Sequence, residues 1–135
     1  MLTLDKIYHA AFVLKDVARK TDLIEAPKLS KDCQLYLKTE NLQATGSFKV
    51  RGAYNKIMKR FAEGDLHAVV ASSAGNHAQG VAYAAKAYGC KATIVMPTVT
   101  PLIKVNRTKS YGAEVILHGD VYDDACEYAY KLAEE

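Results

Sequence analysis

Two short stretches of the sequence combine residues that can do chemistry. Residues 45–53 contain Lys49, and residues 72–80 contain a run of serine, glycine, asparagine and histidine. Gly46 and Ser47 precede apolar residues at helical spacing, so Lys49 is predicted to lie in the first turn of a helix. The free N–H groups of that turn carry partial positive charge, which favours the uncharged form of a lysine amine. An uncharged amine attacks a carbonyl carbon to form a Schiff base.

The position of Lys49 admits two interpretations. A cation at a helix N-terminus costs roughly 0.3–1 kcal/mol relative to an acidic residue, and Arg51 adds a second cation to the same turn. In the first interpretation solvent screens both charges and neither has a role. In the second, Lys49 is retained there for its chemistry. The position alone leaves both open.

The second stretch is predicted to form an anion-binding turn. Residues 67–71 are an apolar, β-rich run typical of a covered parallel strand, and Gly75 opens a helix rich in small residues. A strand, a Ser/Gly turn and a helix N-terminus together present backbone N–H groups that suit a phosphate or a carboxylate. The stretch matches neither the dinucleotide fingerprint nor the P-loop, so neither chemistry is indicated.

The two stretches together resemble the fold-type II pyridoxal-phosphate enzymes. The matching residues are Ser47-Phe48-Lys49, Arg51-Gly52-Ala53, Ser72-Ser73-Ala74-Gly75-Asn76-His77 and Gln79-Gly80. They are most similar to the threonine dehydratase (threonine ammonia-lyase) group, with serine racemase as a near relative. The resemblance runs from the first helix to the last residue. It implies a lyase that converts L-threonine, or serine, to a 2-oxo acid and ammonia, in isoleucine biosynthesis or threonine catabolism.

The resemblance also implies a role for individual residues. Lys49 would form the Schiff base with pyridoxal 5'-phosphate and then take the Cα proton of the substrate. Asn76 would hydrogen-bond the phenolic oxygen of the cofactor, and Phe48 would flank it. Two alternatives stay open: Phe48 as a core residue, and His77 acting only through its backbone N–H. The turn implied to bind the substrate carboxylate consists of Ser73, Ala74, Gly75, Asn76 and His77.

Two departures from the family pattern affect these expectations. Where serine racemases have a second serine in the turn, this chain has Ala74, so elimination is expected and racemisation is not. The family's Gly-rich loop for the cofactor phosphate, its partner for the pyridine nitrogen and any regulatory domain would lie beyond residue 135. The chain therefore resembles an N-terminal fragment, and by itself it is expected to be inactive.

Composition places the chain among ordinary globular proteins. It has 135 residues, of which 50% are hydrophobic and 24% charged, with a net charge of +3. Without a run of like charges, neither a nucleic acid nor a membrane partner is indicated. The nearest basic cluster, Lys104, Arg107 and Lys109, is expected to be a solvated helix face.

The cysteines and the N-terminus indicate a cytoplasmic protein. Cys33, Cys90 and Cys126 are odd in number and far apart, which argues against disulfides and against a metal site. Buried, reduced thiols are expected instead. The sequence shows neither a membrane-spanning apolar stretch nor the basic-then-apolar order of a signal peptide.

Strands separated by helices predict an α/β fold with an open parallel sheet and flanking helices. We expect residues 1–44 to belong to a larger domain and residues 45–135 to form a small α/β domain. Thr3, Thr100 and Asp120 are predicted helix caps. The expected helices are 3–20, 49–62, 76–88, 101–111 and 121–132, and the expected strands are 34–38, 67–71, 92–96 and 114–118.

Two other functions compete with the dehydratase. One is a non-catalytic α/β module that binds an anion or a nucleotide at the turn from Ser72 to Gly75; such a module has no need of Lys49. The other is a serine racemase or a cysteine-synthase-like enzyme that uses the same cofactor. The expected partners are a small amino-acid substrate and further copies of the same chain, because surface that would meet the larger domain is exposed.

Overall fold

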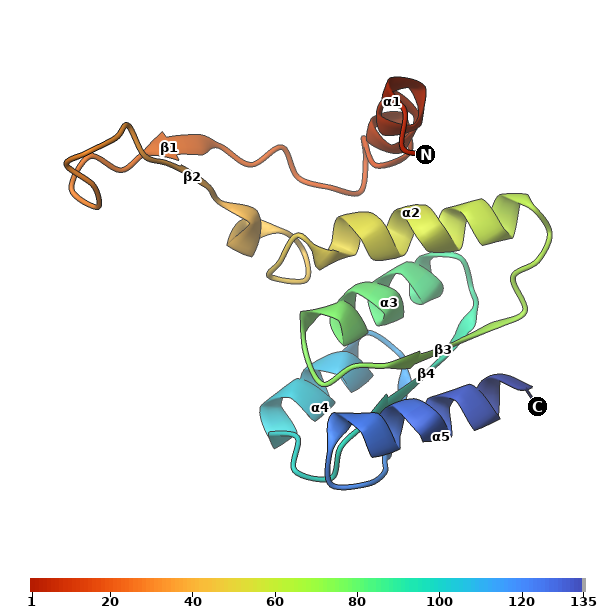
Figure 1. Ribbon diagram of the computed structural model, residues 1–135. Coiled ribbons are helices and arrows are strands. Elements are labelled where there is room, and N and C mark those ends of the chain that lie inside the picture. The colour runs from red at the N-terminus through yellow and green to blue at the C-terminus, as the bar shows by residue number, and fades with distance from the viewer. Residues whose placement is uncertain (135) are drawn as a thin grey trace.

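The computed structural model describes residues 1–134, which form an extended N-terminal arm and a layered α/β unit (Figure 1). In the arm, two short strands pair antiparallel, with Ile24 opposite Leu37. The elements of the arm are α1 (Leu4–Val13), β1 (Leu23–Glu25), β2 (Tyr36–Lys38) and the 3-10 helix η1 (Glu40–Leu42).

The α/β unit contains a three-stranded parallel sheet in the order β3-β4-β5. Helix α3 packs on one face of the sheet with α2 outside it, and α5 covers the opposite face (Figure 1). The predicted parallel sheet with flanking helices is confirmed. Its elements are α2 (Lys49–Ala62), β3 (Ala68–Ser72), α3 (Asn76–Ala87), β4 (Lys91–Met96), α4 (Leu102–Ser110), β5 (Glu114–Leu117) and α5 (Tyr122–Glu134).

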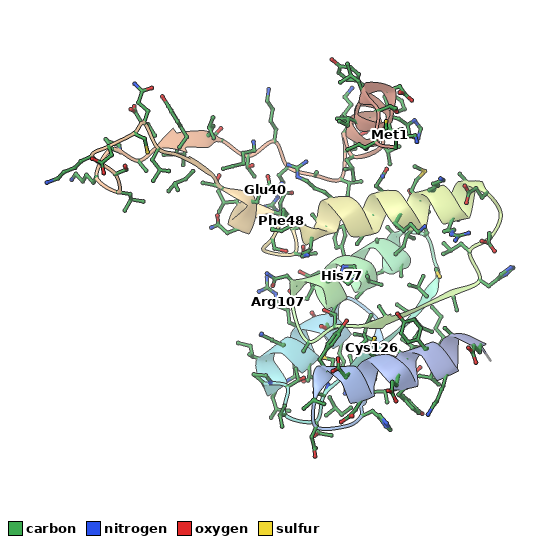
Figure 2. All side chains as sticks on the ribbon, viewed as in Figure 1. Met1, Glu40, Phe48, His77, Arg107 and Cys126 are labelled. Carbon is green, nitrogen blue, oxygen red and sulfur yellow. The ribbon has the colours of Figure 1, made fainter. Side chains whose placement is uncertain are left out.

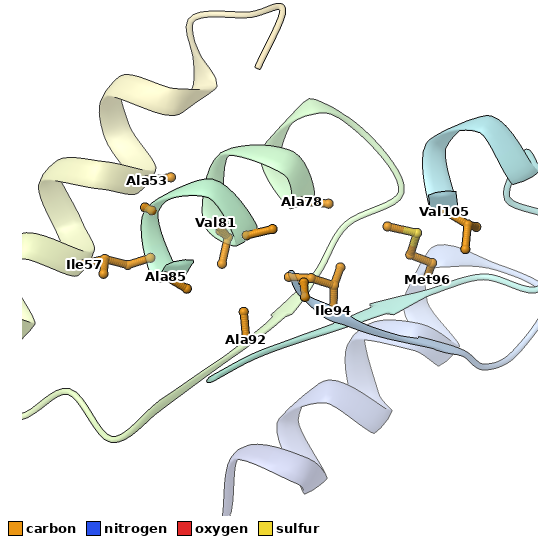
Figure 3. Close-up of a cluster of buried hydrophobic side chains, with 12 residues drawn as sticks. Ala53, Ile57, Ala78, Val81, Ala85, Ala92, Ile94, Met96 and Val105 are labelled. Atoms are coloured by element: carbon orange, nitrogen blue, oxygen red, sulfur yellow. The ribbon is translucent and has the colours of Figure 1, made fainter. Parts of the chain in front are cut away.

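The core lies on both faces of the central strand β4. Ile94 and Met96 are fully buried in the cluster under α3 and α4, whereas Val95, which points the other way, packs against Ala125 of α5. Figure 3 shows that α3 contributes mainly small side chains to this cluster, among them Ala78. Small side chains let the helix axis approach the sheet closely, so the first turn of α3 is held firmly at the end of β3.

Helix α2 crosses α3 at Gly80, where there is no room for a side chain. A Cβ atom at Gly80 would lie 3.1 Å from the carbonyl oxygen of Lys49 and 3.3 Å from the Cβ of Ala53. This close approach fixes the first turn of α2 one helical turn away from Asn76, at the beginning of α3. Gly80 is therefore the residue that brings the two sequence motifs together.

The first helix is shorter than predicted. The apolar spacing predicts a helix to residue 20 with one inward stripe, but α1 ends at Val13 and contains no buried residue. Leu14, directly after α1, is 8% exposed, and the turns that follow it lead to β1. An apolar stripe stabilises a long helix only where another surface covers it, and within residues 1–134 none covers this one.

The predicted caps are wrong in detail. Thr3 precedes α1 without a side-chain hydrogen bond to it, and the buried Thr100 hydroxyl has no partner within residues 1–134. The Asp120 carboxylate accepts a hydrogen bond from Thr98 instead (3.1 Å). Asp124 Oδ2 accepts from the N–H groups of Asp120 (3.0 Å) and Val121 (3.4 Å), so an aspartate inside the first turn caps α5.

The thiols are less buried than predicted. Cys33 is exposed in the arm, and Cys90 and Cys126 are partly exposed; all three are free. The periodicity of short elements does not show which face a lone cysteine takes, and this explains the error. In the part of the chain that the structure describes, no helix combines the length and the apolar character needed to cross a membrane.

Candidate active site

Lys49 is the first residue of α2, as predicted. The helix begins without a side-chain cap and without an acidic residue in its first turn, and the Lys49 N–H donates to Ser47 Oγ (3.2 Å). The Lys49 Nζ lies 5.3 Å from the centroid of the Phe48 ring. Phe48 is 58% exposed, so the alternative that it is a core residue is wrong within residues 1–134.

The turn from Ser73 to His77 is open at the N-terminus of α3. Ser73 Oγ accepts from the N–H groups of Gly75 and Ala78, both at 3.3 Å, which orders the turn. The N–H groups of Asn76 and His77 donate to no acceptor among residues 1–134. A Cβ atom at Gly75 would meet nothing within 4 Å, so space lies above the turn. Free donors, open space and the helix dipole together suit a carboxylate.

The structure brings Lys49 and this turn together. Burial lowers the pKa of His77, and the positive charge of Lys49 lowers it further. The backbone contact at Gly80 places Lys49 beside the start of α3, and His77 itself is exposed there. Figure 2 shows Phe48 beside the start of α2 and His77 on the neighbouring α3. Ala74 and Gly75 are partly buried, and Asn76 is exposed at the start of α3.

Sequence reasoning missed the partner of Arg51. The Arg51 guanidinium binds Glu40 through two hydrogen bonds, Nε to Oε2 (2.8 Å) and Nη2 to Oε1 (2.9 Å). Thr21 Oγ1 donates to the same carboxylate (2.8 Å). Arg51 is thus paired and not simply screened by solvent. Glu40 precedes Arg51 by eleven residues and lies in η1, whereas Arg51 lies in α2. Because the two residues belong to different elements, no period within one element links them, and only the fold reveals the pair.

The basic cluster on α4 is exposed, as expected, but its Arg107 also contacts the turn before Lys49. Lys104, Arg107 and Lys109 are all solvent-exposed. Gly46 has a φ of +74°, and a Cβ atom there would lie 3.0 Å from the Arg107 Nη2. The guanidinium therefore lies against the turn that precedes Lys49, at a position where the positive φ favours glycine.

Stability is expected to depend on the charge of Glu40. The hydrogen bonds from Arg51, partly offset by burial, lower the Glu40 pKa from 4.5 to about 2. Because this pKa is lowered in the folded state, the stabilisation is complete above about pH 4.5 and is lost as the pH falls toward 2. Glu40→Gln should remove roughly 1–3 kcal/mol at pH 7 and nothing at pH 2. Urea unfolding across this range measures the effect.

A matched control is available at the other end of α2. Glu63 forms exposed ion pairs with Lys59 (3.7 Å) and Arg60 (4.0 Å). Exposed pairs contribute little, so Glu63→Gln should change the free energy of unfolding by less than about 1 kcal/mol. Equal losses in the two variants at pH 7 would contradict the assignment of Glu40.

Comparison with known families decides the relationship. A family profile described as "Pyridoxal-phosphate dependent enzyme" matches residues 14–135. The chain belongs to this family of pyridoxal-phosphate dependent enzymes. An L-threonine ammonia-lyase of Thermotoga maritima is 50% identical over 137 residues, covering 100% of this chain and 34% of that protein.

Solved structures of the family share the fold. The processed form of threonine deaminase isoform 2 from Solanum lycopersicum aligns with a TM-score of 0.81 and 39% identity, over 98% of this chain and 39% of that one. A pyridoxal 5'-phosphate-dependent aspartate racemase aligns with a TM-score of 0.92 and 34% identity, over 98% of this chain and 43% of that one. The chain thus spans about a third to two fifths of the length of these relatives.

The residues present fit the family's cofactor, pyridoxal 5'-phosphate. Lys49 offers a primary amine, and it lies beside an open turn whose Asn76 and His77 N–H groups are free within residues 1–134. The Ser72 hydroxyl, at the end of β3, is buried without a partner in the same residues. Unpaired polar groups of this kind are costly unless a ligand or water satisfies them. By contrast, no group of three or more His, Cys, Asp and Glu side chains in residues 1–134 is placed to hold a metal ion.

Proposed function

We propose that this chain is part of a pyridoxal-phosphate dependent threonine dehydratase. Such an enzyme removes the β-hydroxyl and the amine of L-threonine, or of serine, to give a 2-oxo acid and ammonia; threonine gives 2-oxobutanoate. The observation that carries the proposal is the position of Lys49: it is the first residue of α2, and its backbone lies against Gly80, one helical turn from the open turn at Asn76. The similarity to relatives named threonine ammonia-lyase and threonine deaminase supports the choice of substrate.

Each residue then has a defined task. The N–H groups of Asn76 and His77 bind the substrate carboxylate at the positive end of α3. Asn76 would also donate from its side-chain amide to the phenolic oxygen of the cofactor, and Phe48 would flank the cofactor. Pyridoxal phosphate supplies an aldehyde and an electron-withdrawing ring when bound. The Lys49 nitrogen would accept the proton from the substrate Cα.

The arm and the α/β unit are proposed to serve different domains. Residues 45–135 would be the small domain, which carries Lys49 and the carboxylate turn, and residues 1–44 would pack on a larger domain. The exposed apolar side chains of the arm support this division, since Phe12, Leu23 and Leu29 are 77%, 62% and 67% exposed. The same surfaces support self-association of the whole protein. Alone, the chain is expected to release no 2-oxobutanoate from threonine.

Selective chemical labelling tests the proposal. The chain is incubated with pyridoxal phosphate, reduced with borohydride, digested and mapped by mass spectrometry. We expect modification of Lys49 to exceed that of exposed lysines such as Lys59 and Lys91, which serve as references in the same molecule. Equal modification of all lysines would contradict the proposal and favour a non-catalytic module that binds an anion or a nucleotide at the turn.

Racemisation is the second candidate activity, favoured by the TM-score of 0.92 to an aspartate racemase. Ala74 argues against it, because a methyl side chain in the turn can neither donate nor accept a proton on the side opposite Lys49. In the longer protein we expect elimination from L-serine to be faster than formation of D-serine by at least about 10²-fold. Chiral chromatography of the products measures the ratio. Comparable rates would overturn this reading.

The cellular setting follows from the same proposal. We infer a cytoplasmic enzyme of threonine catabolism or isoleucine biosynthesis. Three free cysteines support a reducing compartment. The relatives include catabolic and biosynthetic enzymes, and some of the biosynthetic ones are chloroplastic. The rate of 2-oxobutanoate production by the whole protein, measured with and without isoleucine, would distinguish the two roles.

A further inference from the structure

The start of α2 lacks the usual means of holding a helix N-terminus in place. Its N-cap residue, Phe48, makes no capping hydrogen bond, and its first turn has no acidic residue. Ser47 Oγ accepts from the Lys49 N–H (3.2 Å) but brings no charge. Lys49 and Arg51 add positive charge where the helix dipole is already positive. A turn of this kind frays unless an anion outside the helix holds it. Glu40 is an anion in contact with this turn.

Glu40 belongs to a cluster that we call the Glu40 cluster, comprising Thr21, Glu40, Gln43 and Arg51. The side chain of Glu40 is 15% exposed and receives both hydrogen bonds of the bidentate pair with Arg51. Thr21 donates to its Oε1 (2.8 Å), and Gln43 Nε2 lies 3.3 Å from each carboxylate oxygen. The ion pair therefore closes the segment 40–51, and Lys49 lies inside the closed segment.

The same segment is held from two further directions. Gln43, only 4% exposed, accepts from the N–H of Arg19 (2.9 Å) and donates to the carbonyl of Arg19 (2.8 Å), which fastens the cluster to the arm. On the other side, the hydroxyl of Tyr111, directly after α4, donates to the Ala44 carbonyl (3.0 Å). With both ends of the segment fixed, the direction in which the Lys49 side chain leaves α2 is fixed as well.

We propose that the Glu40 cluster positions Lys49: the Glu40–Arg51 pair closes the segment 40–51 and so holds Lys49, whose backbone lies against Gly80, beside the first turn of α3. Glu40 and Arg51 are thus positioning residues, which act through Lys49. The inference rests on the proposed function for the importance of Lys49, but it concerns only contacts within this chain. Figure 2 shows Glu40 next to the start of α2, close to Phe48.

The pKa of His77 reports the position of Lys49 without any cofactor. NMR titration of His77 in the wild-type chain and in Lys49→Gln measures how much the lysine charge lowers it. If the cluster positions Lys49, Glu40→Gln should raise the His77 pKa by at least about half of the rise seen in Lys49→Gln, and should not raise it further in a Lys49→Gln background. Arg51→Gln should raise it as well, with a part of the rise coming directly from the lost positive charge. Both should also lower the ratio of Lys49 to Lys59 labelling by pyridoxal phosphate and borohydride.

Glu40→Gln is the decisive variant because direct electrostatics predicts the opposite sign. Loss of a negative charge would by itself lower the His77 pKa, so a rise requires that Lys49 has moved. Arg60→Gln, which removes the ion pair with Asp65 at the far end of α2, is the matched control and should leave the His77 pKa unchanged. Far-UV circular dichroism verifies folding. If Glu40→Gln does not fold, Thr21→Val removes one hydrogen bond to Glu40 and should give a smaller rise of the same sign.

An unchanged or lowered His77 pKa in folded Glu40→Gln, or an equal rise in Arg60→Gln, would overturn the proposal. So would an equal rise in the Lys49→Gln background, since the effect would then not pass through the lysine. These outcomes are separate from failure of the dehydratase proposal. That failure would appear as unselective labelling of the wild-type chain, and the titration does not depend on labelling.

Discussion

Replacing Lys49 with alanine should abolish the selective modification of this chain by pyridoxal phosphate and borohydride, and should reduce threonine dehydration by the longer protein at least about 10³-fold. Under the proposed function, Lys49 supplies the amine at the first turn of α2 and the base that takes the Cα proton. Its backbone lies against Gly80 of α3, one helical turn from the turn proposed to bind the carboxylate. Peptide mapping and 2-oxobutanoate assay measure the two effects.

Lys59→Ala is the matched control for this experiment. Lys59 lies on the same helix but near its C-terminal end, where its side chain is 68% exposed and forms only a surface ion pair with Glu63. Its removal should leave both labelling of Lys49 and dehydration within about twofold of wild type. Retention of dehydration in Lys49→Ala, or an equal loss in Lys59→Ala, would show that the amine assigned here is not the reacting one.

Gly80→Ala should destabilise the chain and displace Lys49. The added Cβ would lie 3.1 Å from the Lys49 carbonyl oxygen, 3.2 Å from its carbonyl carbon and 3.3 Å from Ala53 Cβ, so backbone atoms with no freedom to rotate away must move. Overpacking of this kind costs roughly 1–3 kcal/mol, which exceeds the gain of about 0.5–1 kcal/mol from replacing glycine by alanine within a helix. Selective labelling of Lys49 should be lost in parallel.

Gly52→Ala provides the control because it makes the same change in the neighbouring helix. A Cβ atom at Gly52 would meet nothing within 4 Å. Only the helix propensity then changes, and the free energy of unfolding should rise by about 0.5–1 kcal/mol with labelling unaffected. Urea unfolding of both variants measures the change in the free energy of unfolding, and peptide mapping measures the labelling of Lys49. If Gly80→Ala behaves like Gly52→Ala, the two helices do not depend on this contact.

The α/β unit was predictable because its signals are local. The apolar run before Ser72, the small residues of α3 and the helical spacing after Lys49 each report a single element. Their alternation predicts the parallel sheet that β3, β4 and β5 form. The arm was predicted poorly for the same reason, since α1 and its apolar stripe depend on a surface that residues 1–134 do not supply.

The sequence by itself determined which reactive groups are present and in which elements they lie. These are an amine in the first turn of one helix, a Ser/Gly turn at the start of another, and the sheet on which the helices pack. Only the tertiary structure decided how these parts meet. Two contacts join residues that are far apart in the chain. Helices α2 and α3 cross at Gly80, and Arg51 pairs with Glu40. Local periodicity reports which face of an element is apolar, but the atoms that oppose a given residue are set by how the elements pack.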